Sequence, residues 1–467
     1  MAKGFEFEHQ VEFRADAASD ILRSIPALPG VFALRGQDPN AEPYLTRTAD
    51  LRRRMTRLLA PPESQSKRLN LRDRVHSIEY AVTGSDFESF LVLYDAASAI
   101  FGHTEARRRL RLHTPFFLRL TMGTAHPRVY STNRLSKRGL PQTYGPFPSR
   151  AAAERYCDAV LDLFKLRRCY EDLEVSPTHP GCAYGEMKKC MAPCNMTCSA
   201  EEYAAEAAAV EAFFQSHGDS MLSGIAADRD RASEDMDFER AAALHEQFLK
   251  VKAAAALADD IVRPVPDLAA VVVQAAAKRD DDAQEAAVFL LRGGCMAGPA
   301  RLSTLGVRAV KEQTSVGSSL FAQPLMLQAI PLGDEAGPVD SPEVRAERVL
   351  GELDNKVGGG ADLGTLSDHL SLFRRWYYRP EKQRAGEVFL PNPDGSWPIR
   401  RILRGAARMA IGEPRPMAET QRELAPAAKV KILHEGRPDV ERLVPIVARK
   451  TKKISTKDTK EEHEGPQ

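Results

Sequence analysis

The sequence predicts an α+β protein of several domains, and three observations support this fold class. Short apolar runs with strand character alternate with amphipathic helical stretches over the first hundred residues. Residues 200–257 have a helical pattern nearly throughout, and residues 260–310 then return to strands, most clearly in residues 268–273. The 467 residues suffice for about two to four domains.

The composition indicates a soluble, cytoplasmic protein with a basic N-terminal part. The N-terminus has no apolar signal segment, and no stretch approaches the roughly 18 apolar residues of a membrane helix. Residues 1–150 carry 23 Lys and Arg against 15 Asp and Glu, and residues 106–150 hold ten basic residues and no acid. Such a run is either a solvated face or a phosphate-contacting surface, and its length favours phosphate. The candidate DNA contacts within it are Arg107, Arg108 and Arg109.

The first segment, to about residue 105, has the pattern of a small α/β domain. Residues 30–34 follow Pro29 and predict a strand, and residues 44–46 predict its hairpin partner across a turn-rich loop. Residues 49–59 predict a helix with one apolar face, formed by Leu51, Met55, Leu58 and Leu59. A second helix is expected over residues 87–100.

The next segment is basic, strand-like and irregular up to residue 150, where Ser149 is placed to cap a helix ending near residue 164. Little regular structure is expected in residues 165–198, which hold five of the seven cysteines. Four of them are separated by twelve, seven and three residues, a density typical of metal ligands rather than of free thiols. Spacing alone leaves both zinc and an iron–sulfur cluster open. The four are Cys169, Cys182, Cys190 and Cys194, and Cys198 is an extra thiol able to replace one of them.

Residues 200–257 predict a helical hairpin, within which residues 236–252 carry an apolar stripe. The stripe serves either the protein's own core or a partner. Further on, a loop is expected around residues 331–343, a helix over 341–373, and a disordered charged tail at the C-terminus. The run at residues 374–379, RRWYYR, is either a nucleic-acid contact or a buried aromatic edge flanked by solvated arginines.

The order of motifs in the cysteine-rich segment resembles the UvrC family. The chain reads YGPFPS from Tyr144, LDLFKLRRC ending at Cys169, KCMAPC ending at Cys194, and EEY ending at Tyr203. The family has similar blocks at similar gaps, and its four cysteines hold a 4Fe–4S cluster. The resemblance therefore implies that the four cysteines named above are the cluster ligands.

The N-terminal segment resembles the family's GIY-YIG nuclease domain, through PGVF from Pro29 and YLTRTADLRRR ending at Arg54. The resemblance implies catalytic roles for Tyr44, Arg47 and Arg54, and a metal ligand, for Mg²⁺ or Mn²⁺, in Glu88. In this interpretation Arg52 and Arg53 are expected to contact DNA. The site departs from the family at Phe32, which lacks the expected tyrosine hydroxyl, and at Thr46 in place of glycine. A lost proton transfer lowers a rate by roughly 10²–10⁴.

The stretch MDFERAAALHEQ from Met236 resembles the family's UVR motif, which pairs with UvrB. The resemblance implies partner-binding roles for Phe238, Ala242 and Leu244. Residues 260–410 faintly resemble the opening of the family's RNase H-like half, but we find no matching set of catalytic acids. Two hypotheses follow: a metal-dependent nuclease that cuts damaged double-stranded DNA on the 3′ side of a lesion, or a non-catalytic iron–sulfur adaptor that binds DNA and UvrB.

The expected organisation has five parts. In chain order they are a degenerate GIY-YIG-like domain (15–105), a basic linker with a cysteine-rich iron–sulfur segment (106–200), a UVR helical hairpin (201–258), a truncated RNase H-like region (259–445) and a disordered tail (446–467).

Overall fold

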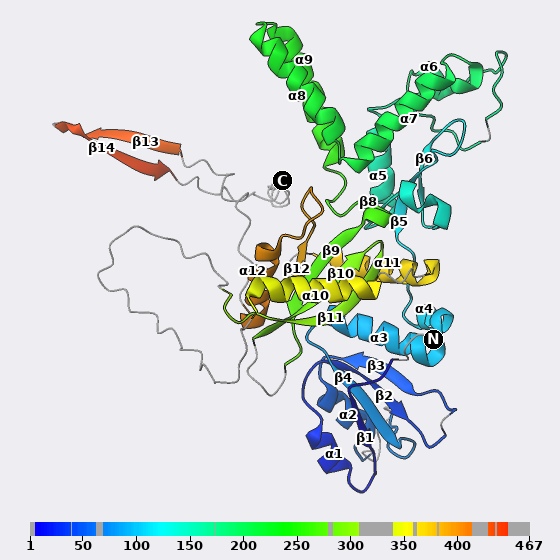
Figure 1. The fold of residues 1–467 in the computed structure, drawn as a ribbon, viewed down its shortest axis with the longest axis vertical. Helices are drawn as coiled ribbons and strands as arrows, with labels where there is room; N and C mark the ends of the chain where they lie inside the picture. The colour runs from blue at the N-terminus through cyan, green and yellow to red at the C-terminus, as the bar shows by residue number, and fades with distance from the viewer. Residues whose placement is uncertain are drawn as a thin grey trace, which may run out of the picture. The chain divides into compact units, whose positions relative to one another are not determined.

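The computed structural model confirms a mixed α/β protein with several sheets (Figure 1). It describes residues 5–38, 40–61, 69–171, 173–278, 284–307, 340–357, 362–380 and 383–412, and the backbone of 428–434 and 437–446. The chain divides into a compact unit over Met1–Glu413 and a second unit over Pro414–Gln467. Within the described residues, no helix is long and apolar enough to cross a membrane.

The N-terminal sheet is antiparallel with strand order β1-β4-β2-β3, from β1 (His9–Glu12), β2 (Gly30–Arg35), β3 (Tyr44–Thr48) and β4 (Ser77–Val82). Helices α1 (Ala18–Ser24) and α2 (Leu51–Leu59) pack on it. Asp50 caps α2 by accepting the amide hydrogen of Arg53 at 2.8 Å. A Cβ atom at Gly30 would lie 2.4 Å from the Ala81 carbonyl oxygen, so only glycine lets β2 approach β4 this closely. The predicted hairpin and helix are both present.

Helix α3 (Asp86–Phe101) leaves this domain and packs against a second sheet. That sheet is antiparallel with order β11-β10-β9-β12, from β9 (Ala269–Ala275), β10 (Glu285–Arg292), β11 (Cys295–Ser303) and β12 (Glu387–Phe389). Alternate residues of each strand point to opposite faces. One face, with Val272, Phe289 and Leu291, packs on α3 and α11 (Leu363–Tyr377). The other packs on α10 (Pro342–Val357) and α12 (Ile399–Ile411).

The segment predicted as a basic linker is a folded domain, which corrects that part of the prediction. After α4 (His103–Arg109), strands β5 (Phe116–Leu120), β6 (Val129–Thr132) and β7 (Thr143–Phe147) form a sheet completed by β8 (Arg263–Pro264). Its apolar face is covered by α5 (Arg150–Leu161), capped by Ser149 as predicted, and by α7 (Ala200–Gln215). We call this the middle domain.

The helical region contains three helices rather than one hairpin. Helix α7 belongs to the middle domain, since Tyr203, Val210 and Phe213 are buried in its core. The hairpin consists of α8 (Asp219–Glu234) and α9 (Phe238–Ala255), which lie side by side in Figure 1. Short helical turns, α6 (Ala183–Glu186), η1 (Lys137–Gln142), η2 (Pro193–Asn195) and η3 (Val265–Asp267), complete the first unit.

The predicted helix over 341–373 is two helices, α10 and α11, and residues 358–361 between them are outside the described residues. The second unit contributes one antiparallel pair, β13 (Ala428–His434) and β14 (Arg437–Ile446). Most of the predicted loop at 331–343, and the predicted tail beyond Ile446, also lie outside the described residues.

Candidate functional site

Two of the predicted nuclease residues lie together on the N-terminal domain. Tyr44 on β3 accepts a hydrogen bond through its hydroxyl oxygen from the Arg54 guanidinium on α2, at 3.0 Å. Beside them the ring of Phe32 lies 6.2 Å from the Tyr44 ring and is fully buried. Phe32 is therefore a core side chain beside Tyr44 and supplies no polar atom.

Arg47, the third predicted catalytic residue, is engaged by a carboxylate. Its guanidinium forms an ion pair with Asp86 at the start of α3 and stacks over the Phe90 ring, 3.8 Å from the ring centroid. Arg379 approaches the other oxygen of Asp86 at 2.7 Å. Asp86 thus joins two cations, and sequence reasoning missed it because Arg379 is nearly three hundred residues away along the chain.

Glu88 lies in the first turn of α3, three residues after the capping Ser85, and its side chain faces the protein interior. Only 5% of its surface is exposed, and its Oε2 atom accepts the amide hydrogen of Gly84 at 2.8 Å. Burial raises the pKa of Glu88 to about 7, while the Gly84 amide and the charge of Arg301 act in the opposite direction. In the described residues no hydrogen bond or ion pair links Glu88 to Tyr44, Arg47 or Arg54.

The position of Glu88 follows from close packing at the neighbouring glycine. A Cβ atom at Gly84 would lie 2.3 Å from the carbonyl oxygen of Ala275 at the end of β9. The loop before α3 is therefore pressed against the second sheet, and the Glu88 carboxyl is enclosed with it. Across the described residues, no three acidic, histidine or cysteine side chains converge closely enough to hold a single metal ion.

Replacing Glu88 by glutamine is expected to remove a pH-dependent part of the stability. The folded protein holds the Glu88 proton more tightly than the unfolded chain, so the carboxyl penalises folding as pH rises from about 4.5 through about 7. Above that range the variant should be more stable than the parent, by up to the order of 3 kcal/mol. Urea unfolding near pH 5 and pH 8 measures this. The exposed Glu352→Gln is the control; parallel pH profiles for Glu88→Gln and the parent would refute the assignment.

The predicted DNA-contacting arginines differ in how much of their charge remains free. Arg52 donates to the Ile25 carbonyl oxygen at 2.7 Å, whereas Arg53 is exposed. Arg108 pairs with Glu105 at 2.6 Å, and Arg109 pairs with both Glu105 and Glu42 at 2.6 Å. The acids that neutralise this run come from just before it and from the N-terminal domain. In the described part of residues 106–150, the exposed basic side chains without a carboxylate partner are Arg111, Arg134, Lys137 and Arg138.

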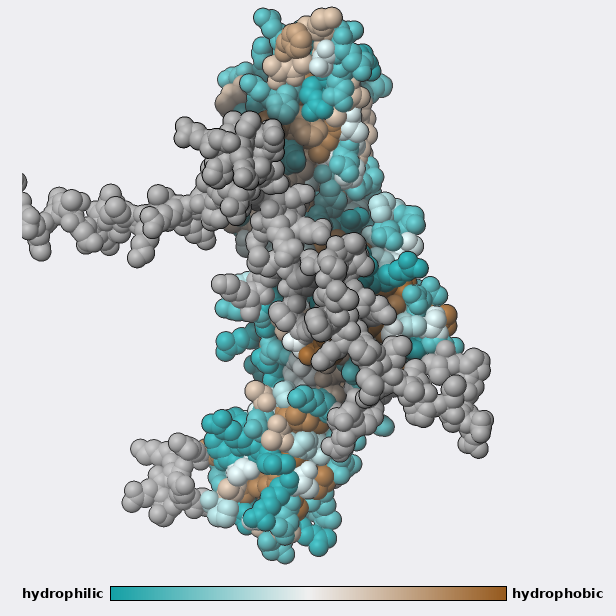
Figure 2. All heavy atoms as spheres, turned by 90° about the vertical axis from the view of Figure 1, so that its left-hand side faces the viewer, coloured by the Kyte–Doolittle hydropathy of each residue, from teal (hydrophilic) through white to brown (hydrophobic). Residues whose placement is uncertain are grey.

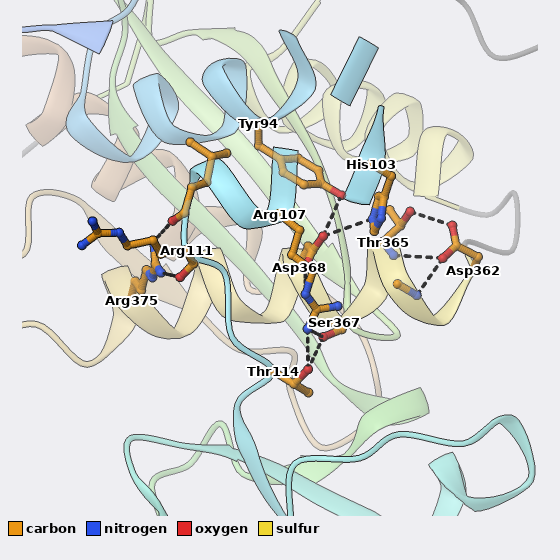
Figure 3. A network of polar contacts seen from close by, with 12 residues as sticks. Tyr94, His103, Arg107, Arg111, Thr114, Asp362, Thr365, Ser367, Asp368 and Arg375 are labelled. Atoms are coloured by element: carbon orange, nitrogen blue, oxygen red, sulfur yellow. Dashed lines mark hydrogen bonds and ion pairs between the residues drawn. The ribbon is translucent and has the colours of Figure 1, made fainter. Parts of the chain in front are cut away.

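Arg107 belongs to a buried polar network that joins α3 and α4 to α11 (Figure 3). Its centre is Asp368, which is fully buried and lies 3.5 Å from Arg107 and 3.1 Å from His103. The Tyr94 hydroxyl donates to the same carboxylate at 3.5 Å, and Thr114 contacts Ser367 at 2.7 Å. Burial raises the pKa of Asp368, while the neighbouring Arg107 and His103 side chains act against that rise. The Arg107 guanidinium therefore makes its contacts within the protein.

The aromatic and basic run at residues 374–379 also makes internal contacts. Trp376 is 3% exposed, and Arg374 donates to the Pro148 carbonyl oxygen at 2.7 Å. Arg375 donates to the Leu110 carbonyl oxygen at 3.0 Å, and the Tyr378 hydroxyl to that of Pro146 at 2.8 Å. These bonds tie α11 to the middle domain, which is the buried alternative of the two considered from sequence.

The cysteine-rich segment gathers the four predicted ligands around Cys190. Cys190 and Cys194 are buried, and Cys169 and Cys182 are half-buried. Burial raises the pKa of the Cys190 thiol to about 11, and the other three lie close enough to raise it further through their charge. The Ala192 amide donates to the Cys190 sulfur at 3.3 Å. This amide is turned towards the sulfur in a loop where Ala192 takes the left-handed conformation, with φ of 52°.

An open cavity of about 820 Å³ adjoins this segment, and Cys182, Cys190 and Cys198 line it. Cys198 is also close enough to Cys194 for the charge of Cys194 to raise its pKa, after the larger effect of burial. The choice between Cys194 and Cys198 as a ligand therefore stays open. Cys157 on α5 and Cys295 on β11 are buried in apolar cores elsewhere.

The predicted partner-binding residues differ in exposure. Phe238, the first residue of α9, is 68% exposed, and Met236 just before it is 76% exposed. Ala242 is exposed, whereas Leu244 is half-buried against the core of the middle domain. Figure 2 shows apolar surface among polar atoms where the α8–α9 hairpin lies, in the upper part of the view. The apolar stripe thus serves the core along its length and leaves an aromatic side chain free at its start.

The middle domain and the cysteine cluster are similar in sequence to known proteins. Residues 116–213, which contain most of the middle domain and all of the cysteine cluster, match the family described as "UvrC/Cho excinuclease, middle domain". The UvrABC system protein C of Idiomarina loihiensis is 25% identical over 247 residues, covering 53% of this chain and 39% of that protein. That of Brucella abortus is 27% identical over 235 residues, covering 50% and 36%. No solved structure matches the chain.

The matched domain is thus of the excinuclease type. Residues 116–213 are similar to the middle domain of the UvrC family, and about half of the chain is similar to UvrC proteins. The chain spans less than two fifths of the length of these curated relatives.

Proposed function

We propose that this chain acts in nucleotide excision repair as a non-catalytic adaptor that carries an iron–sulfur cluster, binds damaged double-stranded DNA and docks on UvrB. The single observation that favours the adaptor over a nuclease is the burial of Glu88, which is hydrogen-bonded to Gly84 and unlinked to the Tyr44–Arg54 pair. Phe32 adds to this, since a phenyl ring moves no proton.

The donor set fits an iron–sulfur cluster. Four cysteine thiols make up the ligand set of such a cluster, and Cys169, Cys182 and Cys194 all lie near Cys190. The Ala192 amide offers the kind of N–H to sulfur contact that stabilises a thiolate ligand. A bound cluster would supply a rigid cross-link and a redox centre, and the four cysteines would hold it.

The hairpin α8–α9 is the proposed UvrB-binding element. Phe238 and Met236 expose apolar side chains at its turn, with no partner in the described residues. Exposed aromatic side chains are frequent anchors of protein interfaces, where their burial supplies much of the binding energy. The DNA-binding role is assigned to exposed basic side chains of the N-terminal and middle domains that have no carboxylate partner within the described residues: Arg53, Arg111, Arg134, Lys137 and Arg138.

An incision assay tests the adaptor proposal. We expect no nicking of a lesion-containing duplex by the full chain with UvrA, UvrB and Mg²⁺ or Mn²⁺, at levels where a full-length UvrC nicks readily. Glu88→Ala should leave the result unchanged. Nicking that is lost in Glu88→Ala would overturn the adaptor and establish the second candidate, a nuclease cutting on the 3′ side of the lesion. The Tyr44–Arg54 hydrogen bond is the observation that favours this second candidate.

A further inference from the structure

Arg167 is the one arginine in the described residues that is almost completely buried, with 9% of its surface exposed. It lies two residues before Cys169. Its Nη1 atom donates to the Cys169 sulfur at 3.9 Å and to the Glu171 carbonyl oxygen at 3.1 Å, and its Nε atom donates to the His126 carbonyl oxygen at 3.1 Å. Two backbone oxygens therefore aim this guanidinium at the sulfur.

The backbone around Arg167 is held equally firmly. Its amide donates to the Tyr203 hydroxyl at 3.0 Å, and that hydroxyl donates to the Pro127 carbonyl oxygen at 2.8 Å. Tyr203 is fully buried on α7, so the position of Arg167 is set by the core of the middle domain rather than by a surface loop.

The charge of Arg167 lacks an acidic partner within the described part of the chain. By contrast Arg408, whose side chain is 13% exposed, forms two hydrogen bonds to Glu387, at 2.6 and 2.8 Å. Burying a guanidinium without an opposite charge is unfavourable. Two groups near Arg167 that can carry negative charge are the sulfurs of Cys169 and Cys190. The Cys169 sulfur contacts Arg167 directly, and Cys190 lies near Tyr203, as Arg167 does.

A second guanidinium, that of Arg128, contacts the backbone of Cys169. Arg128 donates to the Cys169 carbonyl oxygen at 3.1 Å and lies over the Tyr130 and Tyr170 rings, at 5.3 and 5.1 Å from their centroids. It contacts the backbone, whereas Arg167 contacts the sulfur itself. The two arginines therefore make different contributions: Arg128 holds the chain at Cys169, and Arg167 acts on the ligand atom.

We propose that Arg167 is a positioning residue for the cluster, which orients the Cys169 sulfur by hydrogen bonding and raises the reduction potential of the cluster through its buried charge. This inference rests on the proposed iron–sulfur site. A cluster with four thiolate ligands is anionic, and one added electron makes it more so, so a fixed cation beside it stabilises the reduced form more than the oxidised form. Net charge and hydrogen bonds to sulfur are the known determinants of such potentials.

The test is an anaerobic redox titration followed by visible absorption, on full-length protein whose iron and labile sulfide are first counted. Arg167→Gln should keep the cluster and lower its midpoint potential. At a fixed potential we expect at least a tenfold change in the ratio of oxidised to reduced cluster, which corresponds to about 59 mV for one electron. Arg167→Lys, which keeps the charge, should have a midpoint potential between those of the parent and of Arg167→Gln. Arg150→Gln is the matched control, since Arg150 is exposed and pairs with Glu154 at 2.7 Å.

The outcomes separate the two proposals. Parent protein without iron and sulfide overturns the proposed cluster itself. Cluster-loaded Arg167→Gln with the parent's potential overturns the role of Arg167 and leaves the cluster standing, as does an equal shift in Arg150→Gln. If Arg167→Gln binds no iron, the midpoint potential of Arg167→Lys becomes the deciding measurement. A value equal to that of the parent then overturns the inference.

Discussion

Replacing Cys190 by serine should remove nearly all bound iron and labile sulfide from the purified protein. Cys190 is the buried thiol around which the other three gather, and a serine oxygen is a poor ligand for iron in a cluster. Its sulfur also receives the Ala192 amide, so the loop geometry is adapted to this residue. Iron and sulfide analysis with visible spectroscopy on anaerobically purified protein provides the measurement.

Two other buried cysteines provide matched controls. Cys157→Ala and Cys295→Ala alter thiols in apolar cores that are not among the proposed ligands and should leave the iron content unchanged. Comparing Cys194→Ala with Cys198→Ala resolves which of these thiols is a ligand. Full iron content in Cys190→Ser would contradict the proposed ligand set, and a colourless parent that contains zinc would support the other metal left open by the spacing.

Local signals in the sequence predict the elements that depend on local interactions. The strand from Gly30, its hairpin partner from Tyr44, and the helix capped by Ser149 all occur where the pattern places them. The β2–β3 pairing joins residues at most 18 apart, and the Ser149 cap joins residues three apart. Residues 106–150 were predicted to be strand-like but not to form a sheet, because that sheet is completed by the pairing of β7 with β8, whose Arg263 lies more than a hundred residues further along the chain.

The candidate site also combines features that local sequence predicts with features that depend on residues far apart in the chain. The cysteine set was predicted from its spacing, and the structure places Cys169, Cys182 and Cys194 near Cys190, while their role as ligands stays a prediction. The state of the nuclease-like residues was not, since it depends on distant partners. Arg47 meets Asp86, and Glu88 is enclosed because Gly84 packs on β9. Arg167 was overlooked because an arginine beside a cysteine carries no signal until its burial is known.

Replacing Phe87 by alanine is expected to lower the free energy of unfolding by about 3–5 kcal/mol. Phe87 is the second residue of α3, yet its ring lies 5.2 Å from the ring of Phe289 and 5.0 Å from that of Trp376, and only 2% of its surface is exposed. The side chain therefore supports the second sheet and α11 rather than the N-terminal sheet. Urea unfolding followed by tryptophan fluorescence reports on this core directly, because Trp376 is part of it.

Phe238→Ala is the matched control, because it removes the same ring from a position that is 68% exposed. Its stability should stay within about 0.5 kcal/mol of the parent, while its binding to UvrB should weaken. The two variants therefore separate a phenylalanine that holds the fold from one proposed to hold a partner. If Phe87→Ala changed far-ultraviolet dichroism but left the fluorescence transition of Trp376 in place, α3 would belong to the N-terminal domain alone. The enclosure of Glu88, which depends on α3 packing against the second sheet, would then lose its physical cause.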